Sequence, residues 1–317
     1  MIKAYSYLSV NKKFNHTVRL KPARIILGFF LLLKNEGMLA FIVCRNERKS
    51  YTLMKKVKAK KSLGQNFLQD VEIVERIFEV ADVSSIDWVF EIGPGTGVLT
   101  AVLAKRVEKV LAIELDHQLV ARLQQQFVDS QSVSILEGNI LEIDMKELLE
   151  TSGFTEHPYK IIANIPYYIT APIIKMLLSL KHQPVSLTLM VQDEVAERLA
   201  ARPGSMSLLS LMAQYYATVE KKFFVPKKAF DPVPKVDSAV IRIIPRRAYD
   251  PEEDRKVFRL ARAGFAARRK TLVNNLSSSL SIAKAAVEEK LQQLGLRPDI
   301  RAQALSVEDW ERLAKIF

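Results

Sequence analysis

Short apolar segments that are typical of strands alternate with helix-like segments between residues 87 and 201. The strand-like runs cover residues 87–92, 109–114, 132–136, 159–163 and 186–191, and the helix-like stretches cover 98–106, 117–128, 171–180 and 193–201. This alternation predicts a parallel sheet that is covered by helices. In such sheets ligands bind at the carboxyl ends of the strands. The residues that follow each strand are therefore the first candidates for a functional site.

A glycine-rich turn follows the first of these strands. Residues 93–97 read GPGTG, and a helical pattern begins directly after them. Glycines such as Gly93 and Gly95 permit a tight turn and a close approach of the backbone to a ligand. The spacing differs from the G-x-G-x-x-G of a dinucleotide site, and no Lys-Ser/Thr pair of a P-loop follows. These features argue against a nucleoside triphosphate.

Two further strands end in polar residues that suit a nucleoside. Glu114 ends the second strand, about twenty residues after the first glycine, where a carboxylate can accept hydrogen bonds from both ribose hydroxyls. Asn139 follows the third strand, where its amide can bond an adenine edge. Each residue alone is compatible with an ordinary strand end. The turn, the acid and the amide in this order predict a cofactor that carries a nucleoside.

The fourth strand ends in the sequence NIPY at residues 164–167. Its amide and backbone carbonyls can accept the two N–H bonds of a planar amino group, and its aromatic ring can stack on the plane of that group. The alternative is a plain turn in which Pro166 starts a helix. Its position at the same edge of the sheet as the glycine turn favours the first interpretation.

Taken together, these motifs resemble the ribosomal RNA adenine N6,N6-dimethyltransferases. The matching segments are residues 60–68 (KKSLGQNFL), 93–97, Glu114, 164–167 and 230–238 (FDPVPKVDS). The resemblance covers about Lys55 to Phe317 and is closest to the subgroup that acts on small-subunit rRNA. Family members commonly carry Asp at the position of Asn139. This departure affects the adenine contact rather than the activity.

The resemblance implies the fold, the reaction and the partners. The expected fold class is α/β, a Rossmann-like methyltransferase sheet with a small C-terminal helical domain. The donor is S-adenosylmethionine, with no metal, and the products are two adjacent N6,N6-dimethyladenosines in a hairpin near the 3′ end of 16S rRNA within a pre-ribosomal small subunit. One alternative is a large-subunit adenine methyltransferase of the macrolide-resistance type. Another is a non-catalytic ribosome-assembly or transcription factor.

The resemblance also assigns roles to individual residues. The donor site is expected to comprise Asn66, Leu68, Gly93, Gly95, Glu114, Asn139 and Asn164, and the catalytic set Asn164, Ile165, Pro166, Tyr167 and Phe230. Asn164 and the Ile165 carbonyl would hold the adenine N6. Tyr167 and Phe230 would stack on opposite faces of the base, although Phe230 could instead be a core residue that anchors its loop. Tyr168 is interpreted as structural, and Glu91 as a support for the glycine turn or for the donor's methionine ammonium.

The domain boundaries follow from a change of pattern after Pro245. Two strands at 218–225 and 238–244 are expected to form an antiparallel pair at the sheet edge. Helices are predicted at 70–83, 252–264, 268–280, 283–294 and 306–316. We therefore expect a basic and apolar extension over residues 1–53, a catalytic domain over 54–247 and a helical RNA-binding domain over 248–317.

The positive charge is unevenly distributed. The chain has a formal net charge of +12, and residues 1–53 hold ten Lys or Arg and two Asp or Glu, so only four of the twelve net charges fall in the rest. RNA binding must then depend on local patches. Three basic runs are candidates for phosphate contacts, each with a solvated face as the alternative. They are Lys55, Lys56, Lys58, Lys60 and Lys61; Lys221, Lys222, Lys227, Lys228 and Lys235; and Arg268, Arg269 and Lys270.

Residues 1–53 admit two interpretations. The apolar run at 25–33 is too short to cross a membrane. The segment is either a leader or the result of an upstream start codon, and a start at Met54 is favoured. With that start we expect a cytoplasmic monomer without a membrane partner. The single cysteine, Cys44, excludes an intramolecular disulfide, and the four histidines lack metal-ligand spacing.

Overall fold

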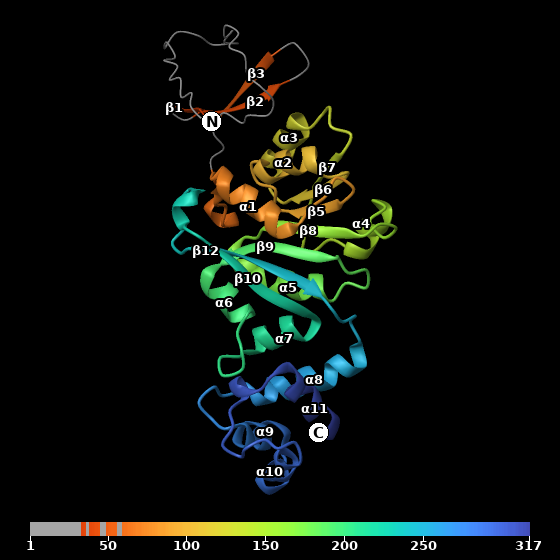
Figure 1. Ribbon diagram of the computed structural model, residues 1–317, viewed down its shortest axis with the longest axis vertical. Helices are drawn as coiled ribbons and strands as arrows, with labels where there is room; N and C mark the ends of the chain where they lie inside the picture. Colours follow the sequence, from red (N-terminus) through yellow and green to blue (C-terminus); the bar gives the residue numbers. More distant parts are fainter. Residues whose placement is uncertain (1–32, 36–37, 45–48, 56–58) are drawn as a thin grey trace. The chain divides into compact units, whose positions relative to one another are not determined.

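The chain divides into two units, Met1–Lys58 and Ala59–Phe317. A computed structural model describes residues 33–35, 38–44, 49–55 and 59–317 (Figure 1). In the first unit β1 (Leu33–Asn35), β2 (Met38–Cys44) and β3 (Lys49–Lys55) form an antiparallel sheet in that order. Most of the apolar run at 25–33 lies outside the described residues. Met54 lies within β3, and a start at that residue stays a prediction.

The second unit is built on a seven-stranded sheet in the order β10-β12-β9-β8-β5-β6-β7. The parallel strands are β5 (Trp88–Ile92), β6 (Lys109–Glu114), β7 (Val133–Glu137), β8 (Tyr159–Asn164) and β9 (Ser186–Gln192). β12 (Ser238–Pro245) pairs antiparallel with β9 and with β10 (Ala217–Val225), the predicted pair at the edge. The predicted α/β fold class is confirmed.

The strand order places a topological switch between β5 and β8. After β5 the chain adds β6 and β7 on one side of it, and then returns to add β8 and β9 on the other side. Loops that leave β5 and β8 therefore diverge and open a crevice at the carboxyl edge. The glycine turn follows β5 and the NIPY sequence follows β8, so the fold brings these two motifs together.

Helices cover both faces of this sheet. Neighbouring residues of β8 point to opposite faces, and Ile162 packs in one apolar cluster with α1 (Val71–Ala81) and α2 (Val98–Arg106). Ile161 packs in a second cluster with α5 (Thr170–Leu178) and α7 (Leu208–Tyr216). The remaining helices of this part are α3 (His117–Gln126), α4 (Met145–Thr151) and α6 (Asp193–Leu199). α4 and α7 were not predicted from the sequence.

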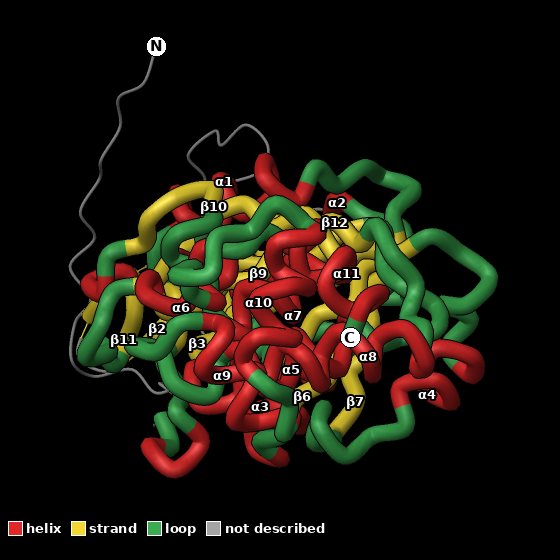
Figure 2. Tube along the Cα trace, turned by 90° about the horizontal axis from the view of Figure 1, so that it is seen from below, coloured by secondary structure: helices red, strands yellow, loops and turns green. Residues whose placement is uncertain are grey.

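Four helices follow the last strand. They are α8 (Pro251–Gly264), α9 (Leu272–Leu280), α10 (Lys284–Gln293) and α11 (Val307–Ile316), and Figure 1 shows them gathered beyond α7. Seen from below, they lie in front of the strands (Figure 2). The predicted helix at 268–280 begins only at Leu272, because the Thr271 hydroxyl caps it by accepting from the Asn274 N–H at 3.3 Å.

The apolar core continues from the sheet into these helices. Trp310 of α11 is fully buried and stacks on Phe265, with ring centroids 5.4 Å apart. Gly264 permits this approach, since a Cβ there would lie 2.4 Å from the Trp310 ring. The predicted boundary at residues 247 and 248 falls inside the unit Ala59–Phe317 and stays a prediction. None of the helices in the described ranges is long and apolar enough to span a membrane.

A small second sheet holds the segment before α1 in place. β4 (Phe67–Leu68) pairs antiparallel with β11 (Phe230–Asp231). The Gln69 N–H also donates to the Ala229 carbonyl at 2.8 Å. Residues 60–69, which we call the strap, are thereby fixed against the loop before β12.

Candidate active site

A pocket of about 240 Å³ lies at the switch point. Its walls come from the strap and from the loops that follow β5, β6, β7 and β8. Ten of the eleven predicted site residues line it: Asn66, Leu68, Gly93, Gly95, Glu114, Asn139, Asn164, Ile165, Pro166 and Tyr167. The eleventh, Phe230, does not.

The Glu114 carboxylate closes the glycine turn. Oε2 accepts from the Gly95 N–H at 3.0 Å, and Oε1 accepts from the N–H groups of Leu115 and Asp116, both at 2.9 Å. Gly95 has a φ of +59°, which only glycine adopts readily. Burial, together with the negative charge of Asp116, raises the pKa of Glu114. The residue predicted for the ribose thus also fixes the backbone of the turn.

Glu91 is fully buried below the turn. Its Oε2 accepts from the Thr100 hydroxyl of α2 at 2.7 Å, and its Oε1 has no partner among the described residues. Burial raises the pKa of Glu91 to about 8, and the charge of Glu114 adds to the rise. Glu91 therefore connects β5 to the helix that follows the turn. Its expected role as a support for the turn or for the donor's ammonium stays a prediction.

The Asn139 side chain is engaged in its own turn. Its Oδ1 accepts from the Leu141 N–H at 3.1 Å, and its Nδ2 donates to Glu142 at 2.8 Å. Two apolar side chains that the sequence analysis missed, Leu115 and Leu141, also line the pocket and remain 44% and 39% exposed. Each follows a polar strand-end residue by one or two positions, and that position was the only signal in the sequence.

The NIPY turn stands opposite these groups. The Asn164 Nδ2 donates to the Asn66 carbonyl of the strap at 3.3 Å, and the Ile165 N–H donates to the Met190 carbonyl at 3.2 Å. The Tyr167 hydroxyl lies 2.6 Å from the hydroxyl of Ser238, which is fully buried. Burial raises the pKa of Tyr167. Ser238, which was not predicted from the sequence, thus anchors the Tyr167 hydroxyl.

Tyr168 lines the pocket, whereas Phe230 does not. Phe230 is 3% exposed and packs with Leu68 and Val240 in the core, so it is placed as the alternative interpretation described. Tyr168, interpreted as structural, is 58% exposed and lines the pocket. Its ring lies over Gly64, where a Cβ would be 3.3 Å away.

The basic runs differ in how many of their cations are paired. Lys221 bonds Asp193 at 2.7 Å, and Lys222 bonds Glu220. Lys60 bonds Asp116 at 2.7 Å. Exposed cations for which no ion pair is found within residues 59–317 are Lys227, Lys228, Lys235, Arg268, Arg269 and Lys270. Lys55, Lys56, Lys58 and Lys61 carry no described side chain.

The sequence matches a known protein family. The family model described as ribosomal RNA adenine dimethylase matches residues 56–317. A ribosomal RNA small subunit methyltransferase A of Dehalococcoides mccartyi is 40% identical over 265 residues, which cover 83% of this chain and 88% of that protein. The protein of that name from Streptococcus equi subsp. zooepidemicus is 40% identical over 262 residues, covering 80% and 90%.

Two solved structures share the fold. A dimethyladenosine transferase from Plasmodium falciparum superposes with a TM-score of 0.67 at 25% identity, covering 78% of this chain and 95% of that one. The 23S rRNA methyltransferase ErmE gives a TM-score of 0.64 at 25% identity, covering 79% and 98%. The fold comparison alone does not separate an enzyme of the small subunit from one of the large subunit.

Proposed function

The chain belongs to the ribosomal RNA adenine dimethylase family and is an rRNA adenine methyltransferase, and on this premise we propose its target and the roles of its residues. The proposed reaction transfers methyl groups from S-adenosylmethionine to N6 of two adjacent adenosines near the 3′ end of small-subunit rRNA. Relatives named for the small subunit, at 40% identity, favour this target over the large subunit. The proposed enzyme is a cytoplasmic monomer that acts on a pre-ribosomal small subunit.

The residues on one side of the pocket fit the donor. The Glu114 carboxylate offers about four lone-pair directions and uses three of them on backbone N–H groups, which leaves an acceptor for a ribose hydroxyl. The exposed faces of Leu115 and Leu141 suit the planar adenine. Asn139 would bind the adenine edge, and Asn66, Leu68, Gly93 and Gly95 complete the donor site. When bound, S-adenosylmethionine supplies a methyl group that is already activated by the sulfonium.

The NIPY turn fits the acceptor base. Because the Asn164 amide nitrogen is turned to the Asn66 carbonyl, its Oδ1 is the group left to accept an N6–H bond. The Ile165 carbonyl would accept the second N–H bond, which aims the nitrogen lone pair at the methyl carbon. N6 gains positive charge as it attacks, so these fixed oxygen dipoles stabilise the transition state. The single observation that carries the proposal is that this turn and the glycine turn line one pocket.

The target base must leave its stack to reach the pocket. The Tyr167 ring, held by Ser238, would stack on one face of the base and contribute ~1–3 kcal/mol. Lys227, Lys228 and Lys235, which have no ion pair among the described residues, lie in the loop that carries β11 and would contact phosphates. Arg268, Arg269 and Lys270 would extend that contact to the helical part.

Labelled donor and immature ribosomal subunits test the proposal. Purified protein is incubated with small subunits that lack the modification and, separately, with unmodified large-subunit rRNA, and the labelled nucleotides are mapped. We expect label on two adjacent adenosines of small-subunit rRNA, and labelling about 10²–10³-fold slower with Asn164→Ala. Label on large-subunit rRNA would instead establish the macrolide-resistance type of activity. Binding to the small subunit without label would establish a non-catalytic assembly factor.

A further inference from the structure

The strap forms one wall of the pocket, although it belongs to neither the sheet nor its helices. It contributes residues 63–68 to the lining, and Asn66 lies against Asn164. Its far end is fixed by the pairing of β4 with β11. The pocket is closed on the donor side only if the other end of the strap, which begins at Lys60, is also held in place.

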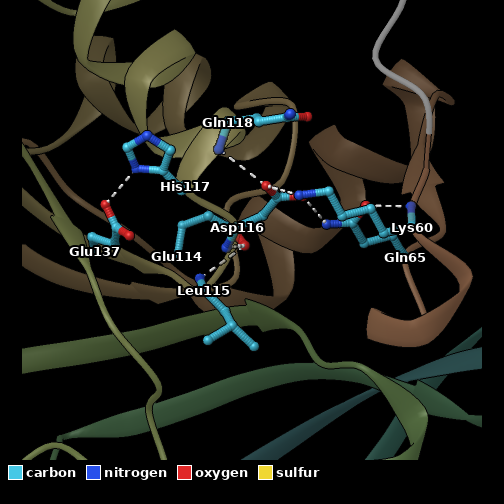
Figure 3. Close-up of polar contacts among 8 residues, drawn as sticks. All are labelled: Lys60, Gln65, Glu114, Leu115, Asp116, His117, Gln118 and Glu137. Atoms are coloured by element: carbon cyan, nitrogen blue, oxygen red, sulfur yellow. Dashed lines mark hydrogen bonds and ion pairs between the residues drawn. The ribbon is translucent and has the colours of Figure 1, made fainter.

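A single buried carboxylate holds the near end. Asp116 is 3% exposed; its Oδ1 bonds the Lys60 ammonium at 2.7 Å and its Oδ2 accepts from the Gln65 amide at 3.0 Å (Figure 3). Lys60 and Gln65 are also joined to each other, since the backbone N–H of Lys60 donates to the Gln65 Oε1 at 2.8 Å. The Asp116 Oδ1 further accepts from the Gln118 N–H at 3.0 Å, which caps α3.

The same residue is bonded to the proposed ribose acid. The Asp116 N–H donates to the Glu114 Oε1, while the other oxygen of Glu114 holds the Gly95 N–H. A continuous hydrogen-bonded path therefore runs from the glycine turn through Glu114 and Asp116 to the strap. Figure 3 shows Lys60 and Gln65 reaching Asp116 from the strap, and Glu114 beside it.

The charges of Glu114, Asp116 and Lys60 favour the position of the strap against the pocket. Two buried carboxylates, Glu114 and Asp116, are separated by one residue, and the charge of Asp116 acts on Glu114. The Lys60 ammonium neutralises Asp116 at the pocket rim. Although burial raises it, the bonds from Lys60 and Gln65 hold the pKa of Asp116 below its ordinary value. Opening the strap would remove both side-chain partners of Asp116 and leave it only the Gln118 N–H, which is costly for a carboxylate that is buried in the closed structure.

We propose that Asp116, Lys60 and Gln65 form an ionic clasp that positions the strap over the bound donor. The proposal rests on the proposed function, because the donor is what the strap encloses. Asp116 is a positioning residue: it contacts neither the methyl group nor the base, and it acts through Glu114 and the strap. Donor affinity should therefore depend on the clasp, whereas the affinity for RNA should not.

Binding of S-adenosylhomocysteine by calorimetry tests the clasp without any RNA. We expect Lys60→Met and Asp116→Asn each to weaken binding about tenfold, because each removes a hydrogen bond between charged partners. Lys60→Arg keeps the charge and should restore binding to within about threefold of the wild type. The double variant Lys60→Met/Asp116→Asn should be no weaker than the worse single variant, since the two residues act as one pair.

A matched control uses an ion pair away from the pocket. Arg106 and Glu75 are joined at 2.6 Å on the surface, so Glu75→Gln removes a comparable contact and should leave donor binding within about twofold of the wild type. In methylation assays the clasp variants should raise the KM for the donor more than they lower kcat. Donor affinity within twofold of the wild type in both single variants, with or without a lower melting temperature, would overturn the proposal.

The two proposals fail in distinguishable ways. If the wild type methylates a different RNA, and Lys60→Met still has a lower donor affinity than the wild type, the clasp stands and the proposed target is wrong. If small-subunit rRNA is methylated and the variants bind the donor normally, the clasp is wrong and the target stands. Lys60 is 41% exposed at its side chain, so its replacement does not depend on repacking the core.

Discussion

The proposed donor side of the pocket and the proposed RNA-binding loop differ in how their charged groups are bonded. Glu114 and Asp116 are buried and hold backbone N–H groups of the surrounding turns. On the other side, Tyr168 of the pocket wall is 58% exposed and Val233, between β11 and β12, is 61% exposed. Lys227, Lys228 and Lys235 have no ion pair within the described residues. A small donor needs a shape that exists before it arrives. A folded RNA brings much of its own order, so the surface that receives it can remain open.

The largest effect is expected where the two sides meet, at Asn164. Asn164→Ala removes the Oδ1 acceptor for N6 and should lower kcat about 10²–10³-fold, as loss of a preorganised group in a transition state does. Asn164→Asp keeps an acceptor oxygen and should lose much less. Single-turnover methylation measures both rates. A kcat for the Ala variant within threefold of the wild type would contradict the assigned role and the division of the pocket.

Glu114→Ala tests whether the donor side acts as a unit. The change removes the ribose acceptor and releases the N–H groups of Gly95, Leu115 and Asp116. We expect the affinity for S-adenosylhomocysteine to fall about 100-fold, since several hydrogen bonds of ~1 kcal/mol or more are lost together. RNA binding should stay within twofold. An equal loss of RNA affinity would show that the two sides are not separable.

The lysines of the loop that carries β11 test the proposed RNA-binding surface. Replacing Lys227, Lys228 and Lys235 by Ala should weaken RNA binding about tenfold at moderate salt and lower the slope of log affinity against log salt by about 2–3. Donor affinity should not change. The matched control is Lys221→Ala/Lys222→Ala, whose cations are already paired with Asp193 and Glu220 and should contribute less. Equal losses in both variants would show that pairing does not decide which lysines bind RNA.

The sequence located the strand-end residues of the pocket better than the contacts between distant segments, for a physical reason. Strand-end residues such as Glu114 are located by a local pattern, because the register of a parallel sheet follows from its apolar runs and brings their ends to one edge. α4 and α7 were missed: α4 has only seven residues, and α7 passes directly into β10, so no turn marks its end. In the clasp, Asp116 contacts Gln65 and Lys60, which lie 51 and 56 positions before it in the sequence. No local sequence pattern predicts such a contact.

The same limit explains Phe230 and Tyr168. Both are aromatic residues beside prolines or turns, and the sequence does not tell which of them is buried. Pairing of β11 with β4 draws Phe230 into the core, and the turn after Pro166 leaves Tyr168 at the pocket. Exposure depends on what packs on a loop from elsewhere in the chain, and that is a tertiary property.

The smallest effect on catalysis is expected for Phe230, which the resemblance placed on the acceptor side. Because the side chain packs in the core with Leu68 and Val240, Phe230→Leu should lower the free energy of unfolding by about 1 kcal/mol and change kcat less than threefold. Urea denaturation and single-turnover rates measure the two effects. Tyr168→Ala serves as the comparison, because that ring lines the pocket and its loss should weaken RNA binding with little change in stability. A large fall in kcat for Phe230→Leu at unchanged stability would indicate that Phe230 stacks on the target base. Its loop would then have to open when RNA binds.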